Sequence, residues 1–146
     1  MKRLLLGTAM TLGLAGMAAA QEYKIGISNT VQGNGWREEM VCAMKAQALA
    51  SGKVASLNIA HRNTDAAGQL EDIRNLIQAG VDAIVVNPAN AEGINAAIKE
   101  ATDAGIVVVA VDQAVVETEV EAGVEKAAAA RAVAAVVARA PACLAA

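Results

Sequence analysis

The stretch from residue 80 to residue 113 reads GVDAIVVNPANAEGINAAIKEATDAGIVVVAVDQ, and it decides the fold. It holds two short unbroken apolar runs, residues 83–86 and 106–111, on either side of a segment in which apolar residues recur with helical spacing. Strand, helix and strand in this order are typical of a parallel β-α-β unit. The unbroken runs favour strands covered by helices on both faces.

The same alternation extends toward the N-terminus. We expect strands at residues 24–28 and 54–60, a helix from about Trp36 to Ala50, and a second helix capped by Asp65 and ended by Gly80. Asn90 is the expected N-cap of the third helix, which Gly105 ends. The sequence therefore predicts an α/β fold, an open, doubly wound parallel sheet with helices on both faces.

The first twenty residues have the pattern of a signal peptide. Lys2 and Arg3 precede an apolar run that is too short to span a bilayer, and Ala18 and Ala20 form an A-x-A cleavage site. We expect residues 1–20 to be removed and the mature chain, from Gln21, to be exported without inserting into the membrane. The alternative is a retained N-terminal anchor.

The rest of the composition predicts one domain, residues 21–116, followed by an alanine-rich, low-complexity segment, residues 117–146. The net charge is −3 and the basic residues are scattered, so nucleic acid is not an expected partner. Cys42 and Cys143 could pair in an oxidising compartment, but we expect Cys42 to be a small buried apolar residue. A single histidine, His61, leaves no Cys/His metal spacing.

Ligands of open α/β sheets bind beyond the carboxyl ends of the strands. The residues expected there carry amide, hydroxyl, carboxylate, guanidinium, imidazole and indole groups: Ser28, Asn29, Trp36, Arg37, His61–Asn63, Asn87–Asn90, Asp112 and Gln113. This set suits a neutral polyhydroxylated ligand, because amides and carboxylates bind hydroxyl groups and an aromatic face packs on C–H groups. Structural roles are the alternative for each residue: a core position for Trp36, a turn cap for Asp112, a solvated helix position for Arg37, and local loop hydrogen bonds for the asparagines and His61.

Enzyme signatures are weak or missing in the sequence. Residues 33–38, GNGWRE, supply two glycines of a dinucleotide-binding fingerprint but place Glu38 where the third belongs. No phosphate-binding loop with the P-loop spacing and no G-x-S-x-G nucleophile elbow is present. We therefore expect neither enzymatic activity nor a cofactor.

Several segments in this order resemble the ribose/galactose-type sugar-binding proteins of ABC transporters: YKIGISNT at 23–30, GNGWREEM at 33–40, NTDAAGQ at 63–69, GVDAIVVNP at 80–88 and VAVDQ at 109–113. The resemblance covers the leader and residues 23–115. It implies the N-terminal lobe of a periplasmic binding protein type 1 fold.

The resemblance also implies a function. Proteins of this kind are two-lobed, close on a monosaccharide in the periplasm, and dock on an ABC permease in the membrane. Residues that match the sugar-contacting positions are Asn34, Trp36, Arg37 and Asp112, while Gln113 stands where relatives often have Arg. This substitution leaves the identity of the sugar open.

The sequence departs from such relatives after about Val115, where the alanine-rich segment replaces the expected continuation into a second lobe. We interpret this as a truncation or frameshift, so the chain is expected to be an incomplete copy that binds sugar weakly or not at all on its own. Two alternatives stay open: a periplasmic sugar sensor or chemotaxis co-receptor, and a non-functional fragment.

Overall fold

The computed structural model describes residues 23–112. The expected leader, Gln113, Cys143 and the alanine-rich segment lie outside this range. The described part has four strands and three helices in strict alternation: β1 (Tyr23–Asn29), α1 (Gly35–Ser51), β2 (Val54–His61), α2 (Ala66–Gln78), β3 (Ala83–Asn87), α3 (Asn95–Asp103) and β4 (Val107–Ala110). No helix in residues 23–112 is long and apolar enough to cross a membrane.

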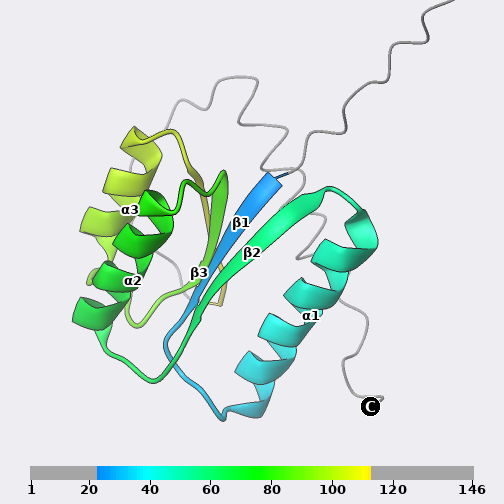
Figure 1. The fold of residues 1–146 in the computed structure, drawn as a ribbon. Helices are drawn as coiled ribbons and strands as arrows, with labels where there is room; N and C mark the ends of the chain where they lie inside the picture. Colours follow the sequence, from blue (N-terminus) through cyan, green and yellow to red (C-terminus); the bar gives the residue numbers. More distant parts are fainter. Residues whose placement is uncertain (1–22, 113–146) are drawn as a thin grey trace, which may run out of the picture.

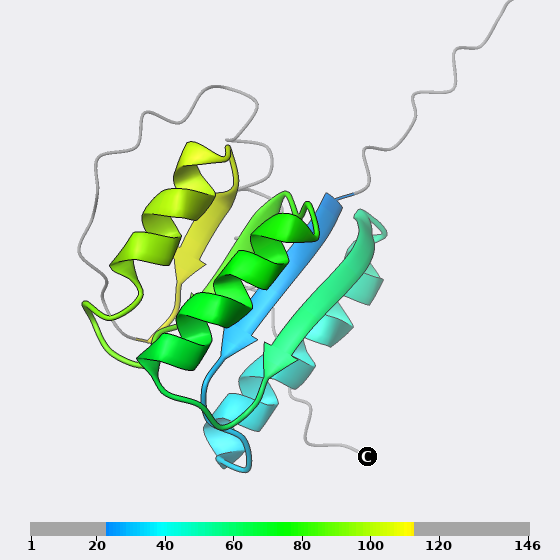
Figure 2. The ribbon, with the colours of Figure 1, turned by 60° about the vertical axis from the view of Figure 1, so that its left-hand side comes forward.

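The strands form one parallel sheet in the order β2-β1-β3-β4. Helix α1 covers one face of the sheet, and α2 and α3 lie side by side on the other (Figures 1 and 2). This arrangement confirms the predicted doubly wound α/β fold. Strand order reverses between β1 and β3, so loops leave their carboxyl ends toward opposite faces, and a crevice for ligands is expected at this point.

Two apolar clusters stabilise the three layers. One lies between the sheet and α2/α3 and includes Ile73, Ile84 and Ile98; the other lies under α1 and includes Ile27 and Met44. Strand β3 is buried along its whole length, as its unbroken apolar run predicts. Strand β4 has a similar run but is only half-buried, because it pairs with β3 alone among the described strands.

Of the two predicted N-caps, Asp65 is confirmed and Asn90 is not; the N-cap of α1, Asn34, was not predicted. Asn34 caps α1 and Asp65 caps α2, each accepting a backbone hydrogen bond in the first turn. The expectation that Asn90 caps the third helix was wrong, because α3 begins only at Asn95. The Asn90 side chain instead accepts from the amide of Glu92, since a short polar side chain readily bonds to the backbone two residues on.

The expectation that Cys42 is buried was also wrong. The residues of α1 that face the sheet are Val41, Met44 and Ala48, which recur at helical spacing. Position 42 falls outside this stripe, and Cys42 is exposed. Cys42 is disulfide-bonded, which also departs from the expected unpaired apolar residue; Cys143 lies outside the described residues.

Candidate functional site

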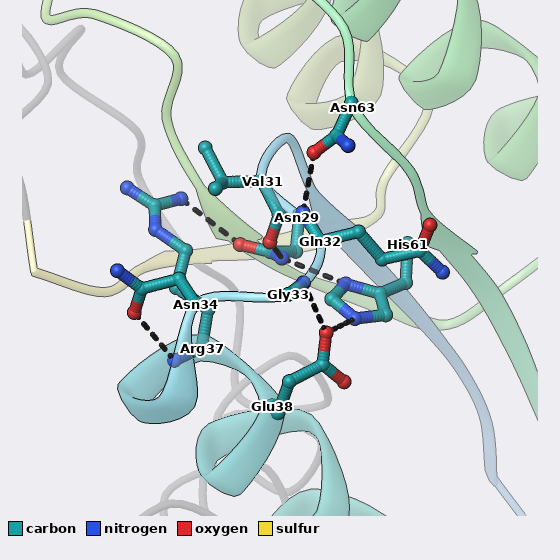
Figure 3. Close-up of polar contacts among 9 residues, drawn as sticks. All are labelled: Asn29, Val31, Gln32, Gly33, Asn34, Arg37, Glu38, His61 and Asn63. Carbon is teal, nitrogen blue, oxygen red and sulfur yellow. Dashed lines mark hydrogen bonds and ion pairs between the residues drawn. The ribbon is translucent and has the colours of Figure 1, made fainter.

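The candidate site lies at the carboxyl edge of the sheet, where the ends of β1, β2 and β3 meet the first turn of α1. Asn29 ends β1 and is paired in register with His61 at the end of β2 and with Asn87 at the end of β3. The loop from β1 to α1, residues 30–34, closes over this edge (Figure 3). The topology therefore gathers three polar strand ends beside one loop.

Asn29 is the centre of the polar network (Figure 3). Its side chain is buried, and its Oδ1 accepts a hydrogen bond from Arg37 Nη1 at 2.9 Å. Its Nδ2 donates to the carbonyl oxygen of Val31 at 2.8 Å and lies 2.7 Å from His61 Nδ1. All three bonds are consistent only with the amide nitrogen facing the histidine, since Arg37 can donate but not accept.

His61 joins β2 to α1 through Glu38. Its Nε2 lies 2.9 Å from Glu38 Oε1, and the same carboxylate oxygen accepts from the backbone amide of Gly33 at 2.7 Å. The pKa of Glu38 is lowered, most by the hydrogen bond from the Gly33 amide and next by the one from the His61 ring, because both donate to the charged carboxylate. Since Asn29 donates to Nδ1, the ring is assigned as the neutral tautomer with its proton on Nε2.

Arg37 reaches from α1 toward the end of β4. Its side chain is largely buried, and Nη2 lies 3.9 Å from a carboxylate oxygen of Asp112. Asp112 has a φ of 75°, in the left-handed region where Asp is tolerated better than most residues. Two residues predicted for the ligand site from distant parts of the sequence are thus brought together, with the Asp112 carboxylate still partly open to solvent.

Trp36 and Asn34 flank Arg37 at the start of α1. Trp36 is 51% exposed, which excludes the core position considered as its alternative. Asn34 Oδ1 accepts from the backbone amide of Arg37 at 3.3 Å, so this predicted ligand residue also performs a structural role as the helix N-cap. Gln113, the remaining predicted ligand residue, lies outside the described residues.

Asn87 and Gln69 form the floor of the site. Gln69 is fully buried on α2; its Nε2 donates to Ser28 Oγ and to the Asn87 carbonyl oxygen, and its Oε1 accepts from the amide of Ala89. Asn87 is also buried, and its side-chain Oδ1 has no hydrogen-bond partner among the described residues. A buried acceptor of this kind favours a hydroxyl donor, from water or from a ligand.

The sequence predicted residues that the structure gathers at this edge of the sheet, but not the contact between Glu38 and His61. It placed Glu38 only as a misfit in a glycine motif and His61 as a local loop residue, whereas the structure joins their side chains. The one available signal was an acidic residue in the first turn of a helix, close to loop amides. Within residues 23–112, no group of three His, Cys, Asp or Glu side chains could hold a metal ion.

The network offers donors and acceptors for neutral hydroxyl groups. This chemistry suits a binding site. Comparison with protein families agrees: the model described as a periplasmic binding protein domain matches residues 25–140. The chain belongs to this family. The match continues past residue 112 into the alanine-rich segment.

Individual relatives have the same character. The chain is 32% identical to the galactofuranose-binding protein YtfQ of Escherichia coli over 78% of its length, and 29% identical to the ribose import binding protein RbsB of Bacillus subtilis over 69%. These matches cover 35% and 32% of the two relatives, so the chain spans about a third of their length. Both relatives are binding proteins.

Solved structures confirm the fold. One is a galactofuranose-binding protein, with a TM-score of 0.60 and 30% identity over 66% of this chain and 32% of that one. Another is the binding protein of the arabinose ABC transporter from Shewanella sp. ANA-3, bound to L-arabinofuranose, with a TM-score of 0.58 and 32% identity over 66% of this chain and 31% of that one. The matching part of this chain therefore has the same fold as about one third of an ABC-transporter binding protein.

Proposed function

We propose that this chain supplies the N-terminal lobe of a receptor that binds a monosaccharide for an ABC importer. The observation that carries the proposal is the convergence of Arg37, Asn29 and Asp112 at the sheet edge where the strand order reverses. Relatives of known structure bind sugars, and the polar groups present here suit hydroxyls. The permease is the proposed membrane partner.

Within the site, each exposed group has a proposed role. The Asp112 carboxylate and the Arg37 guanidinium bind sugar hydroxyls, because charge-assisted hydrogen bonds are the strong ones. Trp36 packs its ring against the C–H face of the sugar. Asn34 and Gln113 complete the set proposed as ligand-binding. The buried Asn87 Oδ1 accepts from a hydroxyl or from a water molecule that bridges to the sugar.

Export is part of the proposal. We propose that residues 1–20 act as the cleaved leader and that the receptor works in the periplasm. Expression of the full chain in a Gram-negative host, followed by N-terminal sequencing of the periplasmic fraction, tests this. The first residue of the exported protein is expected to be Gln21, and a protein retained in the cytoplasm with Met1 would refute it.

Sugar binding is tested by nuclear magnetic resonance titration of the purified chain. The chain contains one Trp, so its indole N–H signal reports on Trp36 alone. D-ribose, D-galactose and L-arabinose are added separately up to millimolar concentrations. We expect weak binding with shifts confined to the Trp36 indole and the residues at the carboxyl edge, because a single lobe supplies only one side of a clamp. No shift with any sugar, or shifts that track Leu49 at the far end of α1, would refute the proposal.

A further inference from the structure

The loop between β1 and α1 is exposed, yet two side chains from outside it hold its backbone. The amide of Gln32 donates to Asn63 Oδ1 at 2.7 Å, and the amide of Gly33 donates to Glu38 Oε1 at 2.7 Å. Gly33 has a φ of 80°, a conformation that suits glycine, and in it the amide of Gly33 itself points at the carboxylate. The position of this loop therefore depends on where the Glu38 carboxylate lies.

His61 fixes that carboxylate from the neighbouring strand. Its ring lies between Glu38, which it meets through Nε2, and Asn29, which it meets through Nδ1. The His61 side chain is only 12% exposed, so neither contact is easily replaced by water. Asn29 in turn holds Arg37 through its Oδ1. The His61 ring is thus linked through Glu38 to the loop between β1 and α1, and through Asn29 to the Arg37 guanidinium (Figure 3).

We propose that His61 is a positioning residue of the proposed sugar site, and that only its neutral Nε2–H tautomer performs this role. This inference rests on the proposed function for its effect on affinity. The Nε2–H tautomer donates to Glu38 and accepts from Asn29, which satisfies both partners. If the proton were on Nδ1, it would face the N–H group of the Asn29 amide, so that two donors met. Rotating the amide by 180° would remove that conflict, but it would point the amide N–H groups at Arg37, which is also a donor.

The single histidine makes the tautomer directly measurable in the wild-type chain. With ¹⁵N-labelled histidine in mildly alkaline buffer, the two ring nitrogens give separate signals that report which one carries the proton, and they can only come from His61. We expect a protonated Nε2 and an unprotonated Nδ1. A ring protonated on Nδ1, or an even exchange between tautomers, would overturn the proposal. This measurement needs neither a variant nor a sugar.

Variants then test the effect on the loop and the site. In His61→Leu, the Gly33 amide is expected to exchange with solvent at least about tenfold faster, since Glu38 loses the ring that holds it. In His61→Gln, whose side-chain amide can still donate to Glu38, much of this protection should return. The matched control is Glu39→Gln on the exposed side of α1, which should leave Gly33 unchanged. Equal exchange in wild type and His61→Leu would overturn the proposal.

The sugar titration separates this inference from the proposed function. If a sugar binds the wild type, His61→Leu should weaken that binding by about tenfold, while the resonances of residues at the opposite end of the sheet stay in place. Unchanged affinity would overturn the proposed role of His61 in the sugar site. If no sugar binds, the proposed function fails, but the tautomer and the Gly33 exchange still decide whether His61 positions the loop and Arg37. Should His61→Leu fail to fold, the wild-type tautomer remains the deciding measurement.

Discussion

Asn29 on β1 lies directly opposite Asn87 on β3 in the sheet register, and both side chains are buried at the carboxyl edge. Two buried amides side by side are costly unless they are hydrogen-bonded. Asn29 uses both ends of its amide within the protein, whereas Asn87 leaves Oδ1 unused among the described residues. The Asn29 side chain thus has hydrogen-bond partners at both ends of its amide. Asn87 Oδ1 has none among the described residues and can accept from a water molecule or a ligand.

The buried hydrogen bonds of the Gln69 side chain should contribute strongly to the stability of the fold. We expect Gln69→Leu to lower the free energy of unfolding by about 2–4 kcal/mol, because the part-buried Ala89 amide and the buried Ser28 hydroxyl lose their partner. Gln78→Leu, at the exposed end of the same helix, should change it by less than about 0.5 kcal/mol. Urea denaturation of both variants measures the difference. Similar values for the two would show that the Gln69 bonds contribute nothing.

A side chain at Gly26 should lower the stability of the fold through its close contact with Leu76. A Cβ at Gly26 would lie 3.1 Å from Leu76 Cδ1 and 3.3 Å from Ile84 Cγ1, so Gly26→Ala should destabilise the fold by about 1–3 kcal/mol. In a Leu76→Ala background the same change should cost at least about 1 kcal/mol less, because space is available. Gly35→Ala, where nothing lies within 4 Å, serves as the control. Additive effects of the two changes would contradict this account of the contact.

The pKa of Glu38 should depend on His61 only in part. The structure lowers this pKa chiefly through the Gly33 amide and secondarily through His61. In His61→Leu we therefore expect the pKa to rise toward the ordinary glutamate value without reaching it, provided Gly33 stays bonded. A carboxyl-carbon titration followed by nuclear magnetic resonance measures both proteins. A pKa that falls in the variant would mean that the histidine does not donate to Glu38.

The ion pair between α2 and α3 should give a stability difference that depends on pH. Arg74 binds both carboxylate oxygens of Glu100, at 2.7 and 2.8 Å, and lowers its pKa in the folded chain. A lowered pKa contributes stability above the unfolded-state value, and this contribution is lost as the pH falls through the folded-state value. Glu100→Gln should thus be less stable than wild type at neutral pH and equal to it in acid.

Thermal unfolding across this pH range, at low and high salt, is the measurement. The difference should also shrink in high salt, because both side chains are about half exposed and the pair is screened. Glu92→Gln, an exposed glutamate before α3, is the control and should show no such trend. A deficit that persists in acid would assign the effect of Glu100→Gln to something other than the ion pair.

Much of the fold could be predicted because the signals are local. Apolar runs marked the strands, and the cap Asp65 with the left-handed glycines Gly80 and Gly105 marked helix ends. Asn90 misled because the same side chain that caps a helix also closes a turn, and the choice depends on the following residues. Cys42 misled because an apolar neighbourhood along the sequence does not say which way a helix turns each residue.

The candidate site was predicted as an edge and not as a network. Parallel strands bring their carboxyl ends together, so Asn29, His61, Asn87 and Asp112 could be assigned to one edge from the order of elements alone. The hydrogen bond between His61 and Glu38 joins residues 23 positions apart, through side-chain directions that no periodicity encodes. The same holds for Arg37, whose acceptor could have been any of several polar strand ends.

The sequence by itself determined the elements of this protein, their alternation, and hence a parallel sheet with a polar carboxyl edge, because these follow from spacing along the chain. Only the tertiary structure decided that Arg37 binds Asn29, that His61 joins Asn29 to Glu38, and that Asn87 keeps a buried oxygen without a partner among the described residues. The physical reason is that strand order and side-chain rotamers, which set these distances, arise from packing between layers.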